Sequence, residues 1–88
     1  MNITYTKHAI ANIKLRNIEK STVEALFIHP QQTMKLEGGA EIAQGIFVRD
    51  KRKFLLRVVF KKEENGDNIK VITAYWTTKI EKYWEGEL

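Results

Sequence analysis

The chain has 88 residues, 43% hydrophobic and 30% charged, and 15 lysines and arginines outnumber 11 aspartates and glutamates to give a formal net charge of +4. This length allows a single domain spanning residues 1–88, and the composition is that of a globular rather than a disordered protein. With no cysteine and only two histidines, disulfides and thiolate metal sites are excluded, and we expect no metal and no cofactor.

The basic character of the chain is concentrated in one segment. Between residues 49 and 62 there are seven basic side chains and one acidic side chain, Asp50. A net charge of +4 alone is compatible with simple solubility, but a local excess of cations favours a polyanionic or acidic partner. No apolar run is long enough to span a membrane, and no signal peptide is apparent at the start. We therefore expect a cytoplasmic protein with no membrane partner.

The first forty residues predict a short strand and two helices. Residues 3–5 are suited to an opening strand, Thr6 to a helix N-cap, and residues 7–17 to a helix with a wide apolar arc. A polar stripe on this helix is either a solvated face or part of a site, and it consists of His8, Asn12 and Arg16. The capping-box pattern S-x-x-E at residues 21–24 predicts a second helix that ends near Ile28, before Pro30.

The rest of the chain predicts an antiparallel meander. Alternating residues at 32–37 and 41–49 indicate two strands separated by a Gly-Gly turn, and residues 50–52 indicate the next turn. A hairpin over residues 54–76 follows, with Asn65-Gly66 as a type I′ turn. A final capping-box match at residues 78–81 predicts a short helix. Its Ile80, Tyr83 and Trp84 fall on one side, either to pack on the sheet or to contact a partner protein.

The register of this hairpin decides which side chains share a face. Counted outward from the turn, Phe60 opposes Val71, Val58 opposes Thr73 and Leu56 opposes Tyr75, which gives an almost wholly apolar face. Arg57 opposes Ala74 and Leu55 opposes Trp76 on the other face. A bulge or a longer loop would exchange the faces.

The expected fold is α+β. Two N-terminal helices pack on one face of a roughly four-stranded antiparallel sheet, and a short C-terminal helix follows. Because the helices can cover only one face, we expect the opposite face, which carries Arg57 and Trp76, to remain at least partly open.

Several short motifs resemble those of a bacterial domain family of unknown function. The opening Tyr5-Thr6-Lys7-His8-Ala9 matches T-x-H-A, with Arg16 eight residues after the histidine. The segment VEALFIHP ends in a proline, and two strands read R-V-V at 57–59 and V-x-T-x-Y at 71–75. The chain is also similar to BrnT toxins and to the wider RelE-like toxins, whose order of elements is helix, helix, meander.

The resemblance implies a metal-independent endoribonuclease, the toxin of a bacterial toxin–antitoxin system, held inactive by a cognate antitoxin protein. A base removes the proton of an RNA 2′-hydroxyl, the alkoxide attacks the adjacent phosphorus, and an acid protonates the leaving oxygen. His8 is the candidate acid or base, Arg57 the candidate phosphate clamp, and Tyr75 a proton donor or stacking ring. Further RNA contacts are expected from Arg16, Arg49, Lys51, Arg52 and Trp76. Ribosome association, a homodimer and a toxin–antitoxin hetero-oligomer all remain open.

Two alternatives stay open beside this hypothesis: a non-catalytic nucleic-acid-binding domain, and a protein-interaction module that docks through Tyr83 and Trp84. The ribonuclease hypothesis carries a geometric difficulty, because the predicted register separates Tyr75 from Arg57, and His8 could reach Arg57 only around a sheet edge. It also requires that Arg57 be neither enclosed in the interior nor paired with a carboxylate, far from His8.

Overall fold

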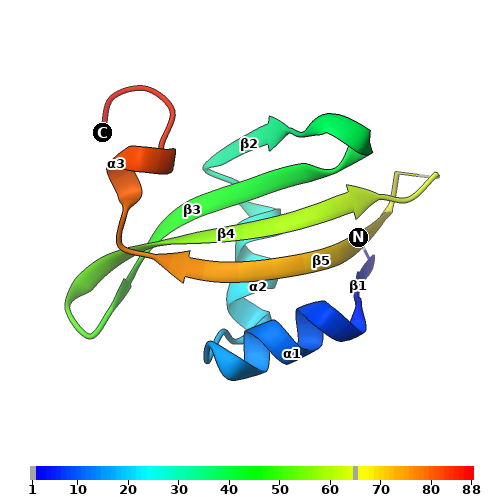
Figure 1. Ribbon diagram of the computed structural model, residues 1–88, viewed down its shortest axis with the longest axis horizontal. Helices are drawn as coiled ribbons and strands as arrows, with labels where there is room; N and C mark the ends of the chain where they lie inside the picture. Colours follow the sequence, from blue (N-terminus) through cyan, green and yellow to red (C-terminus); the bar gives the residue numbers. More distant parts are fainter. Residues whose placement is uncertain (1, 65) are drawn as a thin grey trace.

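Residues 2–64 and 66–88 are described by the structure, which is a computed structural model. The elements, shown in Figure 1, are β1 (Asn2–Tyr5), α1 (Lys7–Leu15), α2 (Lys20–Ile28), β2 (Gln32–Lys35), the 3₁₀ turn η1 (Glu37–Gly39), β3 (Glu41–Arg49), β4 (Arg52–Lys62), β5 (Asn68–Thr77) and α3 (Ile80–Tyr83). The predicted α+β class is confirmed. None of the helices in the described ranges is long and apolar enough to cross a membrane.

All five strands form one sheet in the order β1-β5-β4-β3-β2. The predicted antiparallel meander is present as β2 to β5, but the sheet has a fifth strand, because β1 joins it parallel to β5. A helix follows β1 at once, so this strand has no neighbour in sequence with which to form a hairpin. It pairs instead with the last strand, and the pairing extends to a bond from the Thr6 amide to the Val71 carbonyl at 3.0 Å.

The start of α1 is as predicted, and the start of α2 is not. The Thr6 hydroxyl caps α1 by accepting from the Ala9 amide at 3.0 Å. The second helix begins two residues earlier than the capping box implied. Its N-cap is Glu19, which makes no side-chain cap bond, and the Ser21 hydroxyl donates to the Glu19 carboxylate instead. The second capping-box match also fails, because Lys79 rather than Thr78 occupies the N-cap of α3.

The helices α1 and α2 cover one face of the sheet, which we call the helix face. In Figure 1, α2 lies behind the strands and α1 runs along β5. Buried apolar residues fill the space between them, among them Ala9, Ile13, Val23, Leu26, Leu56, Val58, Phe60 and Val71. The opposite face carries Gln32, Gln44, Arg57 and Tyr75, and we call it the tail face because the C-terminal segment lies on it.

A bulge in the central hairpin changes which side chains share a face. Near its turn, Phe60 pairs with Val71 as predicted, but the register shifts between Val59 and Phe60. Beyond the shift, Arg57 pairs with Tyr75 rather than with Ala74. The shift occurs where β1 ends, and there the Thr6 hydroxyl donates to the carbonyl of Ile72, the extra residue, at 3.1 Å.

Three predicted placements are corrected by this shift. Thr73 pairs with Val59 and Tyr75 with Arg57, so both belong to the tail face instead of the apolar face. Trp76 pairs with Leu56 and packs against the core on the helix face. The Asn65-Gly66 turn rests on Asn65, which lies outside the described residues.

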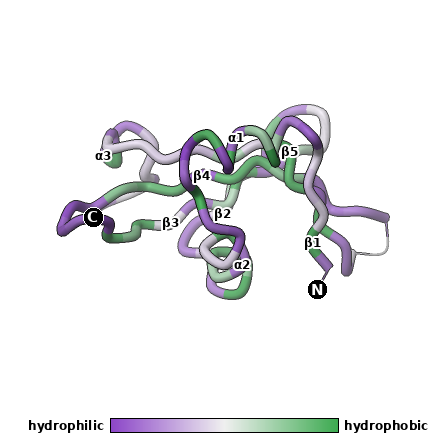
Figure 2. The backbone as a smooth tube through the Cα atoms, turned by 90° about the horizontal axis from the view of Figure 1, so that it is seen from below, coloured by the Kyte–Doolittle hydropathy of each residue, from purple (hydrophilic) through white to green (hydrophobic). Residues whose placement is uncertain are grey.

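The β3–β4 connection is the two-residue turn Asp50-Lys51, with Arg49 paired to Arg52. Both turn residues have positive φ angles, 51° and 65°, as such a tight hairpin requires. The turn forms the hydrophilic end of the molecule at the far left of Figure 2. It presents the cationic side chains of residues 51–53 to solvent.

Candidate functional site

The tail face contains a buried arginine that is surrounded by neutral hydrogen-bond partners. The side chain of Arg57 is 7% exposed. Its Nε donates to the Gln44 carboxamide oxygen at 2.9 Å, its Nη1 to the Tyr75 hydroxyl at 2.6 Å, and its Nη2 to the Met34 sulfur at 3.7 Å. Arg57 and Tyr75, two of the predicted site residues, are therefore in direct contact. The predicted register separated them, and the bulge brings them together.

The C-terminal segment covers this cluster. The ring centroid of Tyr83 lies 4.1 Å from Cζ of Arg57, and the Gln44 carboxamide donates to the Tyr83 carbonyl at 2.9 Å. Gln32 donates to the Glu85 carbonyl at 2.7 Å and accepts from the Glu85 amide at 3.1 Å. The expectation of a partly open face at Arg57 was therefore wrong. Three hydrogen bonds and one cation–π contact hold the C-terminal segment over this side chain.

The guanidinium of Arg57 has no carboxylate within ion-pair distance among the described residues, where the ion pair found is Lys62 with Glu41 at 3.8 Å. An enclosed cation is costly unless it is paired or fully hydrogen-bonded. Here hydrogen bonds and an aromatic ring replace the counter-ion. The cluster around Arg57 is therefore the candidate site, with its charge held by hydrogen bonds and a ring rather than by an ion pair.

The polar stripe of α1 reaches the same strand from the sheet edge. Asn12 donates to the Thr73 hydroxyl at 2.9 Å, and Nη1 of Arg16 donates to the Ala74 carbonyl at 3.0 Å. Two of the three stripe residues therefore contact β5 immediately before Tyr75, although Arg16 remains exposed. The structure does not bring His8 into this cluster, because it is exposed and lies two turns before Arg16 on α1, about 12 Å along the helix axis.

The predicted RNA-binding residues divide into two groups. Arg16 is beside Tyr75, whereas Arg49, Lys51 and Arg52 lie at the β3–β4 turn. Trp76 is half-buried on the helix face, with its ring centroid 5.8 Å from that of Phe47 and 6.2 Å from that of Phe54, and Cζ of Arg49 lies 5.0 Å from its ring. Trp76 therefore serves as a packing residue and not as a stacking platform on the face of Arg57.

Sequence reasoning missed the two glutamines and the role of Tyr83. The signal for Gln44 was present, because this polar residue stands between Ile42 and Ile46 at positions that point to one face, and it is fully buried. A buried carboxamide must find partners, so such a position in a strand marks a polar cluster. Nothing local in the sequence indicates that the partners come from the C-terminal segment.

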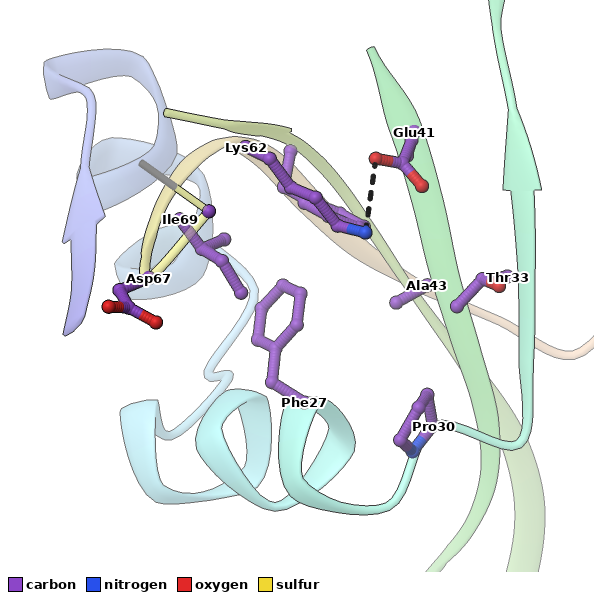
Figure 3. A pocket seen from close by; sticks show the side chains of 10 residues that line it. Phe27, Pro30, Thr33, Glu41, Ala43, Lys62, Asp67 and Ile69 are labelled. Carbon is purple, nitrogen blue, oxygen red and sulfur yellow. Dashed lines mark ion pairs between the residues drawn. The ribbon is translucent and has the colours of Figure 1, made fainter. Parts of the chain in front are cut away.

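A separate pocket of about 360 Å³ lies on the helix face, where α2 meets the ends of β3, β4 and β5 (Figure 3). Its apolar walls include Phe27, Ala43 and Ile69, and the ion pair of Lys62 with Glu41 stands at its rim. None of the predicted site residues lines it, so it is distinct from the cluster around Arg57. Across residues 2–64 and 66–88, no three acidic or histidine side chains are grouped so that they could hold a metal ion.

No protein-family model matches the chain, and neither a curated protein nor a solved structure matches it significantly.

Proposed function

We propose that this protein is a metal-independent endoribonuclease that acts in the cytoplasm as the toxin of a toxin–antitoxin system. RNA is then its substrate and a cognate antitoxin protein its inhibitor. The observation that carries the proposal is the 2.6 Å contact of Arg57 with Tyr75, next to the α1 residues that bind β5. The family-like motifs that contain these residues support the same reading.

Tyr75 is the candidate proton donor. Its hydroxyl oxygen accepts from Arg57, so its own hydrogen is directed elsewhere and is available to an incoming group. In the proposed reaction His8 takes the proton of the 2′-hydroxyl, and the 2′-oxygen attacks phosphorus. The bond from phosphorus to the 5′-oxygen breaks, and Tyr75 gives that oxygen its proton. The products are a 2′,3′-cyclic phosphate and a 5′-hydroxyl.

The requirement that Arg57 not be enclosed in the interior is not met, so the roles of the two arginines differ from those expected from sequence. Arg57 is too enclosed to clamp a phosphate while Tyr83 covers it, so in this conformation it positions Tyr75. Arg16 is exposed and tethered through one nitrogen to the Ala74 carbonyl, which leaves other donors for phosphoryl oxygens. Arg16 is therefore the better candidate for binding the scissile phosphate.

The test is incubation with single-stranded RNA in EDTA, with and without ribosomes, followed by analysis of the new ends. The protein should produce 2′,3′-cyclic phosphates, and Tyr75→Phe and His8→Ala should each lower the rate by about 10²-fold or more. Tyr83→Phe, which changes a phenol on the same face, serves as the control and should keep the activity. Intact RNA under both conditions would overturn the proposal.

The toxin assignment has its own test in cells. Expression should arrest growth, and co-expression of the neighbouring open reading frame should restore it. Tyr75→Phe should not arrest growth at an equal protein level. Unimpaired growth with the unmodified protein, at a level confirmed by immunoblot, would contradict the assignment.

A non-catalytic nucleic-acid-binding domain is the second candidate, and the exposed cations of the β3–β4 turn favour it. These side chains, Lys51, Arg52 and Lys53, lie apart from Tyr75 and need no chemistry to hold a phosphate backbone. Replacing all three by serine should then weaken RNA binding and reduce its dependence on salt. In a non-catalytic binding domain, His8→Ala should leave RNA affinity unchanged. In the enzyme, the same variant should still bind RNA but should lose cleavage.

A further inference from the structure

We infer that the C-terminal segment of residues 80–85 occupies the surface on which an RNA nucleotide binds, so that this segment and RNA compete for the tail face. The inference rests on the proposed function, and it names both the groups that hold the substrate and the device that regulates the site. These groups are Gln32, Gln44 and Arg57.

The segment is held mainly through its backbone. The Gln32 carboxamide both donates to the Glu85 carbonyl and accepts from the Glu85 amide, at 2.7 and 3.1 Å. Gln44 donates to the Tyr83 carbonyl at 2.9 Å. Only the Tyr83 ring adds a side-chain contact to Arg57. A four-residue helix attached in this way has little buried surface of its own, and such segments open at low cost.

The groups beneath the segment are those that proteins use to hold single-stranded RNA. A guanidinium plane stacks on a base as it stacks here on the Tyr83 ring, at 4.1 Å. A carboxamide reads a neighbouring donor and acceptor on a base edge as Gln32 reads the amide and carbonyl of Glu85. The segment therefore offers groups like those of a nucleotide base. The Tyr83 ring is the flat surface, and the Glu85 amide and carbonyl are the neighbouring donor and acceptor.

The charges favour exchange of the segment for RNA. Arg57 contacts the segment through the neutral Tyr83 ring, so its positive charge has no counter-ion there. An RNA phosphate would supply one. Residues 80–85 carry two glutamates and one lysine, so the segment is slightly acidic on a chain whose net charge is +4.

The decisive experiment measures binding of a short 2′-O-methyl RNA, which cannot be cleaved, by Tyr83→Ala and by its matched control Tyr83→Phe. Removal of the ring should raise the affinity about fivefold or more, because apparent affinity rises with the fraction of open molecules. Tyr83→Phe keeps the ring and should bind as the unmodified protein does. In parallel, phenylglyoxal should modify Arg57 faster in Tyr83→Ala, and the RNA should protect it. Unchanged or weaker binding by a folded Tyr83→Ala would overturn the inference.

A locked variant covers the case in which Tyr83→Ala does not fold. Because the chain has no cysteine, Gln32→Cys combined with Glu85→Cys offers a unique pair for a short bismaleimide cross-linker. The cross-linked protein should bind the 2′-O-methyl RNA more weakly than the same double variant before cross-linking, which has also lost the Gln32 carboxamide and so isolates the effect of the lock. Equal binding by the two forms would contradict the competition.

The outcomes separate this inference from the proposed function. If the segment and RNA compete but no variant cleaves ordinary RNA, the competition is supported and the nuclease proposal is contradicted. If ordinary RNA is cleaved but the cross-link does not change RNA binding, the nuclease proposal is supported and the competition is contradicted.

Discussion

The two faces of the sheet are both covered, but by different chemistry. On the helix face, two nine-residue helices pack on apolar side chains, and contacts such as that of Phe27 with Phe60, 4.9 Å between centroids, join the layers. On the tail face, a four-residue helix rests on one guanidinium and two carboxamides. The difference teaches that most of the folding free energy comes from the first face, while the second keeps polar groups available for chemistry.

The boundary between these faces runs through β5. The bulge at Ile72 lets Val71 point to the helices and still turns Tyr75 toward Arg57. It lies where β1 gives way to α1, so the same stretch of chain that sets the register also carries the polar stripe. A single irregularity thus brings together groups that a regular hairpin would separate.

The largest effect is expected from Leu56→Ala on the helix face. Leu56 is fully buried in the core cluster, and such truncations cost about 2–5 kcal/mol of unfolding free energy. Val59→Ala, at a half-buried position on the tail face, is the comparison and should cost about 1 kcal/mol. Urea denaturation of both variants measures the difference. Equal losses would show that the two faces contribute alike.

Gly45→Ala should have the next largest effect, because it tests how closely α2 approaches β3. A Cβ at this position would lie 2.8 Å from Cδ1 of Leu26 and 3.1 Å from Nε2 of Gln31. Overpacking of this kind costs about 1–3 kcal/mol. In the double variant with Leu26→Ala the clash is relieved, so the two losses should not add. Additive losses in thermal or urea denaturation would mean that the contact with Leu26 is not the source of the loss caused by Gly45→Ala.

Arg57→Met examines the tail face itself. Methionine removes the enclosed charge but leaves the buried Gln44 carboxamide oxygen and the Tyr75 hydroxyl without their donor, so we expect a loss of about 1–3 kcal/mol of unfolding free energy. RNA cleavage should also fall by about 10²-fold, since the Tyr75 hydroxyl loses its donor. Denaturation and single-turnover cleavage measured on one preparation separate the two effects. A stability loss as large as that of Leu56→Ala, with cleavage retained, would make Arg57 a structural residue.

Much of the fold follows from local patterns, and the candidate site does not. The Thr6 cap, the strand over 41–49 and the pairing of Phe60 with Val71 follow from residue types and spacing. The bulge depends on β1, whose partner is distant in sequence, so counting from the turn placed Tyr75 and Trp76 on the wrong faces. The cover over Arg57 depends on bonds from side chains to the backbone of Tyr83 and Glu85, which leave no signature in a sequence.

The smallest effect is expected at Tyr5, a second tyrosine that contrasts with Tyr75. Its hydroxyl is enclosed and has no hydrogen-bond partner in the described part of the chain. Tyr5→Phe removes this unpaired group and keeps the ring that Lys20 approaches at 5.0 Å. We expect a gain of about 0.5–1 kcal/mol in the free energy of unfolding. A loss in urea denaturation would show that the hydroxyl is paired.

The same tyrosine predicts how stability changes with alkaline pH. Burial, and then the nearby Glu24 carboxylate, raise the pKa of Tyr5 above its ordinary value of 10.0. The folded protein therefore holds this proton more tightly than the unfolded chain, and the free energy of unfolding should fall as the pH rises above 10. Tyr5→Phe should lose this part of the alkaline decline, and Glu24→Gln should reduce it by a smaller amount, because burial is the larger cause. Urea denaturation of the three proteins between pH 8 and pH 11 measures the decline, and superimposable curves would contradict the assignment to Tyr5.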